Sequence, residues 1–253
     1  MGLADLHTHT SLTDGMMDVR QLLDYAQEHT ELDVLAVTDH DDVTAGLLAR
    51  ELTARHDYRF EVIVGTEVTT LAGHVLALFV EEPIARLQSI ERTIDAIHKQ
   101  GGIAIAPHPL SWLTFSVGES TLRRIAGSPR TGVYFDGIET GNPTLAAKVR
   151  HARVMELNDS LLHLAEVGAS DAHFLPAVAS GVTRFEGATA EALRRALLAR
   201  TTEAFIHEVK LSDIGYGQLV KQQVRSLVLF PTRTMGRKVK RALGRALAGA
   251  GGG

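Results

Sequence analysis

Short apolar runs rich in β-branched residues alternate with stretches of helical periodicity along most of the chain. Runs of this length, bounded by turn residues, predict strands, and apolar positions three or four residues apart predict helices. The repeated order of strand and helix predicts an α/β fold with a parallel sheet, either open or closed into a barrel. The predicted strands cover residues 3–6, 34–37, 60–64, 75–80, 103–106, 137–139, 166–169, 181–184 and 204–207.

Three of the predicted helices begin at residues that commonly cap helix N-termini. Asp18, Ser89 and Thr189 each precede apolar residues at helical spacing, and their side-chain oxygens can accept hydrogen bonds from first-turn N–H groups. The helix after Ser89 is expected to end at Gly101-Gly102, because glycine adopts the left-handed conformation that closes many helices.

Imidazole and carboxylate side chains follow five of the apolar runs, in the segments DLHTH (5–9), TDH (38–40), GTE (65–67), PHP (107–109) and SDAH (170–173). These side chains are ligands of Zn, Mn and Fe. His7 and His9 are two residues apart, so in extended chain they point to the same side. Ligands that follow strands throughout the sequence favour a closed ring with its site at the C-terminal face. An open sheet would draw mainly on a few central strands. We therefore expect a multinuclear metal site.

Composition narrows the class of protein. The 253 residues are 45% hydrophobic and 22% charged, as in ordinary globular proteins. The chain has no cysteine, which excludes disulfides and thiolate ligands and leaves nitrogen and oxygen ligands for any metal. No signal-peptide pattern and no bilayer-spanning apolar run are visible, so we expect a cytoplasmic protein.

The C-terminal segment has a different charge balance from the rest. Eight Lys and Arg residues and no acidic residue follow residue 220, although the whole chain has a net charge of -4. We therefore expect a domain at 1–210 and a basic amphipathic extension at 211–253 with a disordered, glycine-rich end. Such an extension either contacts nucleic acid or an anionic membrane, or is a helix docked on the domain. Its apolar stripe consists of Met235, Val239, Leu243 and Leu247.

The ligand-bearing motifs, taken together over about residues 3–207, resemble the PHP (polymerase and histidinol phosphatase) family of metal-dependent phosphoesterases. The motifs are DLHTHT with a following Asp14-Gly15, TDH, GTE, GHVLAL, an HP pair and SDAH. The resemblance implies an α/β fold, a distorted (β/α)7 TIM-like barrel, that binds two to three divalent metal ions (Mn, Fe or Zn). The implied ligand sets are His7, His9, Glu67 and Asp171 for one metal, Glu67, His74 and His108 for a second, and Asp14, His40 and His173 for a third.

The resemblance also assigns roles around the metals. Glu67, Asp171 and His173 would serve catalysis, and Asp39 would orient a ligand imidazole from outside. His74 reaches the site only if Thr69–Gly73 forms a tight reversal, and otherwise it is a core histidine at a strand edge. Glu139 ends a strand at the ligand face and is expected to shape the rim or bind substrate. The expected substrate-binding residues are Arg184, Asn142 and Trp112.

Two functions remain open at this stage. The first is a phosphoesterase that hydrolyses a phosphomonoester, or a phosphodiester of a nucleotide or oligonucleotide, through a hydroxide that bridges two metals. The second is a non-catalytic metal-binding module that recognises a phosphorylated partner or an anionic surface. About twenty residues separate GHVLAL from the HP pair, room for a single helix, so we expect a more open cleft than in relatives with an insertion there.

Overall fold

The computed structural model describes residues 1–127 and 132–207. The basic extension predicted at 211–253 lies outside these residues. In the part of the chain that is described, no helix combines the length and the hydropathy that crossing a bilayer requires.

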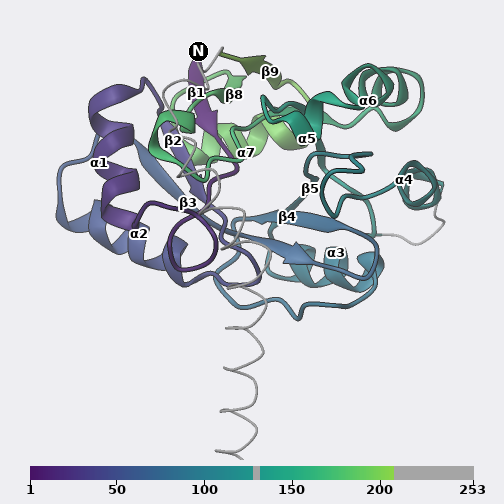
Figure 1. The fold of residues 1–253 in the computed structure, drawn as a ribbon, viewed down its shortest axis with the longest axis horizontal. Coiled ribbons are helices and arrows are strands. Elements are labelled where there is room, and N and C mark those ends of the chain that lie inside the picture. The colour runs from purple at the N-terminus through teal and green to yellow at the C-terminus, as the bar shows by residue number, and fades with distance from the viewer. Residues whose placement is uncertain (128–131, 208–253) are drawn as a thin grey trace, which may run out of the picture. The chain divides into compact units, whose positions relative to one another are not determined.

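A single nine-stranded sheet, in the order β7-β6-β5-β4-β3-β2-β1-β8-β9, forms the framework (Figure 1). Each predicted strand is present, with bounds that differ by a few residues. The largest difference is β3, which continues through the GTE motif. The strands are β1 Gly2–Asp5, β2 Val34–Val37, β3 Glu61–Thr69, β4 His74–Leu78, β5 Ile103–Ala106, β6 Gly137–Gly141, β7 Ala165–Gly168, β8 Gly181–Phe185 and β9 Glu203–Ile206.

Helices join the strands, and the three predicted N-caps are confirmed. The side chains of Asp18, Ser89 and Thr189 each accept a hydrogen bond from a first-turn N–H. Gly101, with φ of 72°, follows the α3 C-terminus as predicted. The helices are α1 Val19–His29, α2 Thr44–Arg55, α3 Ile90–Lys99, α4 Glu119–Ala126, α5 Leu145–Lys148, α6 His151–Leu157 and α7 Ala190–Ala199, with a π-turn η1 at Asn158–Leu162 and a 3₁₀ turn η2 at Leu175–Ala177.

The sheet curls until its two edges meet. β7 packs against β8 and β9. The Gly168 N–H donates to Thr183 Oγ1 at 3.0 Å, and the Thr183 hydroxyl donates back to the Gly168 carbonyl at 2.7 Å. A Cβ at Gly168 would lie 2.0 Å from the Val182 carbonyl oxygen, so this closure requires glycine. Beyond the strand ends, Thr8 and Ala172 form a parallel bridge. The result is a nearly closed barrel.

Strand direction decides where the barrel carries chemistry. β1, β2 and β3 are parallel to one another, as are β5, β6 and β7, while β4 and β8 run against their neighbours. β9 is antiparallel to β8 and so runs in the same direction as β1, and the carboxyl ends of seven strands therefore meet at one mouth. The predicted TIM-like barrel is confirmed. The implied count of seven βα units is not, because β4 and β8 enter the sheet antiparallel.

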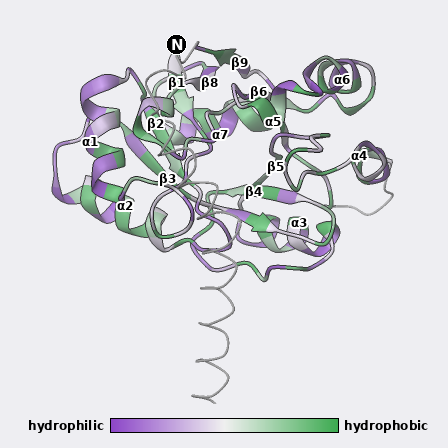
Figure 2. Cartoon of the chain, viewed as in Figure 1, coloured by the Kyte–Doolittle hydropathy of each residue, from purple (hydrophilic) through white to green (hydrophobic). Residues whose placement is uncertain are grey.

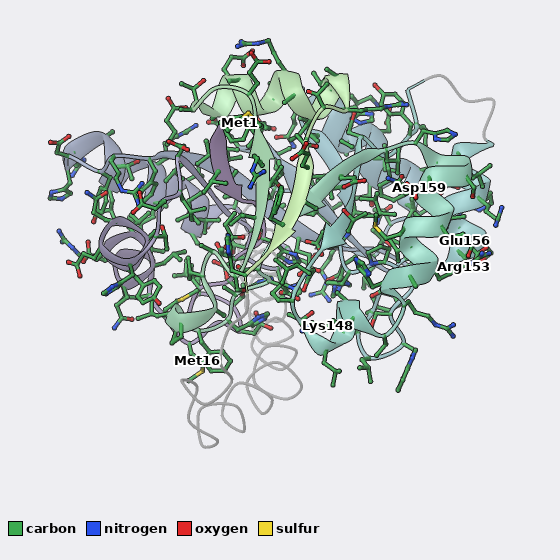
Figure 3. The ribbon with its side chains drawn as sticks, turned by 90° about the horizontal axis from the view of Figure 1, so that it is seen from above. Met1, Met16, Lys148, Arg153, Glu156 and Asp159 are labelled. Carbon is green, nitrogen blue, oxygen red and sulfur yellow. The ribbon has the colours of Figure 1, made fainter. Side chains whose placement is uncertain are left out.

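Apolar side chains fill the barrel and the layers around it, and the apolar positions concentrate on the strands (Figure 2). Residues from β1 to β8 pack inside together with Leu193 and Leu197 of α7. Two outer clusters join α1 and α2, and α3, α4 and α6, to the sheet. Glu119 of α4 accepts hydrogen bonds from Arg153 of α6, which Figure 3 shows beside Glu156. Because α7 follows β8, whose carboxyl end lies opposite the mouth, the apolar side chains of α7 cover that end of the barrel.

Candidate metal centre

All nine side chains that the sequence predicts as metal ligands meet at the mouth of the barrel. They come from five stretches of chain that follow or end strands and from β4, which supplies His74 from its first residue. Their donor atoms form four overlapping groups, each within 4.8 Å. The groups are His9, Asp14, His40 and His173; His7, His9 and Asp171; His7, Glu67 and His108; and His40, Glu67 and His74.

The tight reversal on which His74 depends is present. Thr69 pairs with His74 across the antiparallel β3–β4 ladder, and the Thr70 N–H donates to the Gly73 carbonyl at 3.1 Å. Gly73 has φ of 119°, a conformation that favours glycine. This turn brings the His74 imidazole over Glu67, two residues before the end of β3.

Glu67 lies at the centre of the cluster. Its side chain is buried, and its two oxygens face different imidazoles. Oε1 lies 2.8 Å from His74 Nδ1 and 3.0 Å from His108 Nε2. Oε2 lies 3.3 Å from His7 Nε2, 3.4 Å from His9 Nε2 and 3.2 Å from His40 Nδ1. A carboxylate with one oxygen in each of two ligand sets has the geometry of a bridge between two cations.

The other two carboxylates gather the remaining imidazoles. Asp171 Oδ1 lies 3.6 Å from His7 Nε2, 3.4 Å from His9 Nε2 and 3.6 Å from His173 Nδ1. Asp14 Oδ2 lies 3.2 Å from His173 Nε2 and 3.6 Å from His40 Nε2. His9 Nδ1 is 3.6 Å from Asp14 Oδ1, so His9 presents one nitrogen to each carboxylate.

The spacing of these atoms suits shared cations. Two donors bound to one ion at about 2.0–2.2 Å with tetrahedral angles stand about 3.4 Å apart. His9 Nδ1 and His74 Nδ1 are buried and make no hydrogen bond, although carboxylate oxygens lie 3.6 and 2.8 Å away. These nitrogen and oxygen atoms are close but not hydrogen-bonded, which is the arrangement expected of donors that surround one metal ion. The imidazole and carboxylate donors therefore fit divalent metal ions of the Zn, Mn or Fe type.

Proximity of opposite charges sets the protonation of the metal-free cluster. Burial opposes the charged form of His40, but Glu67 and Asp14 raise its pKa to about 10. Burial likewise opposes charge on His173, whose pKa Asp14 raises to about 9. In return, His74 and His40 hold the pKa of Glu67 well below its usual range against its burial. At neutral pH, His40 and His173 of the metal-free cluster are therefore protonated, and they must lose these protons before they can bind a metal.

Glu139 supports two of the ligands from outside. Its Oε1 accepts from His7 Nδ1 at 2.7 Å, and its Oε2 accepts from the His108 backbone N–H at 2.7 Å. The contact to Nδ1 directs His7 Nε2 into the cluster, because the carboxylate fixes the imidazole tautomer. Asn142 was expected to bind substrate, but its buried amide donates to Glu139 Oε2 at 2.9 Å and accepts from Thr144. Asn142 therefore positions Glu139.

Asp39 has a different role from the predicted one. Its carboxylate accepts from the Thr10 N–H at 2.9 Å, from the Thr10 hydroxyl at 2.5 Å and from the Thr13 hydroxyl. No contact of Asp39 to a ligand imidazole is found among the described residues. The carboxylate instead orders the loop that leads from His9 to Asp14. The prediction failed because Thr10 and Thr13 compete for the same oxygens.

A buried aspartate at the end of β1, which the sequence analysis did not single out, braces the mouth. Asp5 accepts from the Ser170 N–H at 3.0 Å and from the Ala179 N–H at 2.9 Å. Its burial raises its pKa to about 6 despite these hydrogen bonds. The segment that Asp5 holds carries Asp171, whose φ of 51° is unusual outside glycine, and His108 across the mouth has φ of 30°. Such backbone strain is common at functional sites.

Arg184 does not reach the cluster. It pairs with Leu3, at the beginning of β1, whereas the ligands follow the end of that strand. Its guanidinium lies 3.6 Å from the centre of the Phe205 ring and 3.7 Å from Glu203 Oε2. The prediction was wrong because β8 runs antiparallel to β1, which places residues late in β8 at the opposite end of the barrel. Trp112, by contrast, is exposed on the loop after β5, at the mouth.

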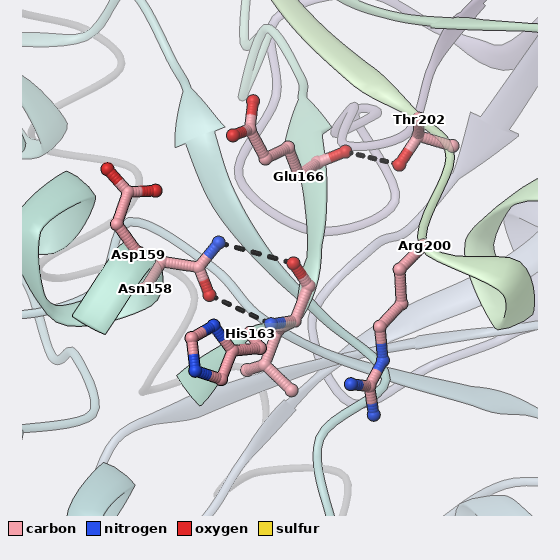
Figure 4. A pocket seen from close by; sticks show the side chains of 7 residues that line it. Asn158, Asp159, His163, Glu166, Arg200 and Thr202 are labelled. Carbon is pink, nitrogen blue, oxygen red and sulfur yellow. Dashed lines mark hydrogen bonds between the residues drawn. The ribbon is translucent and has the colours of Figure 1, made fainter. Parts of the chain in front are cut away.

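The barrel also has a pocket of about 440 Å³ away from the cluster, between η1, β7 and the segment before β9 (Figure 4). Two of its polar side chains are used within the protein. The Asn158 amide pairs with the backbone of Leu164, and the Thr202 hydroxyl donates to the Glu166 carbonyl at 2.7 Å. This pocket contains none of the predicted site residues.

The sequence matches one family model and is similar to known proteins. Residues 160–202, which include SDAH, match a family model described as PHP-associated. An uncharacterized protein of Methanocaldococcus jannaschii is 34% identical over 127 residues, which span 46% of this chain and 72% of that protein. The 5'-3' exoribonuclease Rnm of Salmonella typhimurium is 37% identical over 67 residues, 26% of this chain and 22% of that enzyme.

The fold has a counterpart among solved structures. A two-domain protein from Bacteroides vulgatus, described as containing a predicted PHP-like metal-dependent phosphoesterase, superposes with a TM-score of 0.59 at 22% identity. The superposition covers 88% of this chain and 69% of that protein. The motifs, the barrel, the clustered ligands and the matched family model agree: this chain belongs to the PHP (polymerase and histidinol phosphatase) domain family.

Proposed function

We propose that this protein is a metal-dependent phosphoesterase that hydrolyses a phosphomonoester, or a phosphodiester of a nucleotide or oligonucleotide. The observation that carries the proposal is the convergence of six imidazoles and three carboxylates around Glu67 at the barrel mouth. Family membership and the exoribonuclease and phosphoesterase among the relatives support it.

The charge of the centre suits an anionic substrate. Two or three divalent ions would bring about four to six positive charges against the three carboxylates of Asp14, Glu67 and Asp171. When bound, such ions activate water as a nucleophile and neutralise phosphate oxygens in the transition state. Glu67 would hold two such ions, because its Oε1 faces His74 and His108 and its Oε2 faces His7 and His9.

The exposure of the ligands indicates the side from which substrate enters. The side chains of His7, His9, Glu67 and His108 are at most 3% exposed and form the floor. Those of Asp171 and His173 are 14% and 17% exposed. His40 and His74 complete this open side. A phosphoester that enters here meets Asp171 and His173 first, which is why we assign both to catalysis as the ligands on the substrate side.

A non-catalytic binding module is the competing function. A module that recognises a phosphorylated partner through its metals also needs an accessible side, so exposure alone does not separate the two functions. The completeness of the donor set favours catalysis, because all nine candidate ligands are present at the mouth.

The proposal is tested by a substrate screen. Protein reconstituted with Mn, Fe or Zn is incubated with phosphomonoesters, dinucleotides and oligonucleotides, and released phosphate or nucleotide is measured with and without chelator. Metal-dependent hydrolysis of at least one class supports the proposal, and its size ranks the classes. Absence of hydrolysis with all three metals, while the protein binds them, would support the binding module instead.

A further inference from the structure

Exposed apolar side chains surround one part of the mouth. Trp112, Leu113 and Phe115 are 69%, 45% and 47% exposed within four residues of one loop. Leu71 and Leu87 are 67% and 46% exposed on neighbouring segments. A scattered exposed apolar residue needs no explanation, but a contiguous group beside a charged centre indicates a binding surface.

These segments are neighbours by their hydrogen bonds. The Leu71 N–H donates to the Gln88 carbonyl at 2.9 Å, and the Leu87 N–H donates to the Thr69 carbonyl at 2.7 Å. The 70–73 turn in its turn contacts the loop, because an added Cβ at Gly73 would lie 2.4 Å from the Val117 nitrogen. The loop of residues 110–117, the 70–73 turn and residues 86–88 therefore form one continuous rim.

The loop of residues 110–117 is held at several points. The Leu110 N–H donates to the Val117 carbonyl at 3.0 Å, which closes the loop on itself. The His74 N–H donates to the Phe115 carbonyl at 3.0 Å, and Ser116 Oγ lies 2.9 Å from His108 Nδ1. The loop is thus tied directly to two candidate metal ligands, to His74 through its backbone and to His108 through the Ser116 side chain. A loop fixed in this way presents its apolar side chains at a constant position.

Phe115 brings an aromatic surface next to the reacting centre. Its ring centroid lies 5.6 Å from that of His74, with the two rings nearly perpendicular at 88°. Arg86 lies on the same rim, where its Nε is 3.3 Å from Asp41 Oδ2, so its charge is paired with the carboxylate that directly follows His40. The rim thus combines an aromatic face, a guanidinium and the metal centre.

We propose that the loop of residues 110–117 is the platform on which an unpaired base of the substrate stacks, with Phe115 as the principal contact. This inference rests on the proposed phosphoesterase function and makes its substrate a single-stranded nucleotide or oligonucleotide. The base adjoining the scissile phosphate lies on Phe115, and Trp112 extends the surface to the next base. Aromatic platforms with nearby cations are the usual way in which proteins hold single strands without reading sequence.

The chain carries its own probe for the test. Trp112 is its single tryptophan, so intrinsic fluorescence reports on this loop alone. Protein loaded with Zn, which does not quench fluorescence itself, is titrated with a phosphorothioate tetrathymidylate and with an abasic phosphorothioate tetramer of equal charge. We expect saturable quenching by the thymidylate, and weaker binding of the abasic tetramer measured by competition.

Variants at Phe115 separate stacking from apolar burial. F115L keeps an apolar side chain without a ring and should weaken thymidylate binding about 5- to 100-fold, the range expected for losing one stacked base, while leaving the abasic tetramer unaffected. F115Y keeps the ring and should bind as the unchanged protein does. Y134A is the matched control, because Tyr134 is also 49% exposed but lies just before β6, at the other end of the barrel.

The outcomes distinguish this inference from the function on which it rests. Equal binding of the two tetramers, no effect of F115L, or an equal effect of Y134A would overturn the platform. Quenching by anionic phospholipid vesicles but not by thymidylate would also overturn it, in favour of a lipid occupant. Hydrolysis of para-nitrophenyl phosphate and its bis ester is followed in the same preparation. Its absence with every metal contradicts the phosphoesterase proposal, whereas its presence with failed quenching contradicts only the platform.

Discussion

Replacing Glu139 by Gln tests whether a carboxylate outside the cluster controls metal binding inside it. In the native protein one oxygen accepts from His7 Nδ1 at 2.7 Å, and the other accepts from the His108 N–H and from Asn142. A glutamine has only one acceptor oxygen. If that oxygen stays with the His108 N–H, the amide NH₂ faces His7 Nδ1, which must then accept. His7 Nε2 would carry the proton and lose its ability to bind a metal.

The expected cost is a 10- to 100-fold loss of metal affinity, the range found when an outer partner of a ligand imidazole is removed. This corresponds to about 1.4–2.8 kcal/mol. The assay is competition for Zn or Mn between the protein and a chromophoric chelator. E156Q on α6 is the matched control, because Glu156 is exposed and contacts Arg153 instead of the cluster. Removing the Asn142 amide in N142A should give a smaller loss in the same direction.

The reasoning would be refuted if E139Q bound metal as tightly as the native protein. It would also be refuted if E139Q and E156Q lost affinity equally, since the effect would then follow charge alone. Circular dichroism of the metal-free variant checks that the barrel is intact.

The geometry leads to four further predictions. E67A should retain fewer metal ions by elemental analysis than H74A, because Glu67 offers an oxygen to each of two ligand sets; equal losses would contradict its bridging position. Metal binding should release protons and strengthen as the pH rises towards about 9 to 10, because His40 and His173 must deprotonate, and calorimetry in buffers of different ionisation enthalpy measures this. In the metal-free protein, the stability that these two charged imidazoles contribute should be complete below about pH 6.5 and lost as the pH rises through their raised pKa values. G168A should lower the melting temperature by roughly 6–12 °C for a cost of about 3 kcal/mol, whereas G118A, whose Cβ would meet nothing within 4 Å, should change it little.

The members of the cluster could be predicted from sequence because all but His74 stand at or near the end of a strand, and strand ends converge in a barrel. The same pattern could not separate a ligand from its support. Glu139 also ends a strand at the mouth, and only its distances to His7 and His108 show that it faces their outer sides. A carboxylate at a strand end can thus be assigned to the site from sequence, but whether it faces the metal or the outer side of a ligand cannot.

Two other features could not be predicted from the sequence: the direction of a strand, and which of several possible partners a side chain binds. Arg184 follows a strand as the ligands do, but β8 runs the opposite way, and a single apolar run does not encode its direction. Asp39 lies beside His40 in sequence, yet Thr10 and Thr13 take its oxygens. Such contacts depend on how loops from distant parts of the chain meet.

The central claim is that this cluster binds divalent metals and that the bound metals hydrolyse a phosphoester. One titration tests both parts. Metal is added to metal-free protein, and bound metal per chain and the rate of bis-para-nitrophenyl phosphate hydrolysis are measured at every step. The account predicts two to three ions per chain, activity that rises as these sites fill, and a loss of at least about 10³-fold in kcat for D171A. Hydrolysis by the metal-free protein, or undiminished activity in D171A at full metal loading, would contradict it.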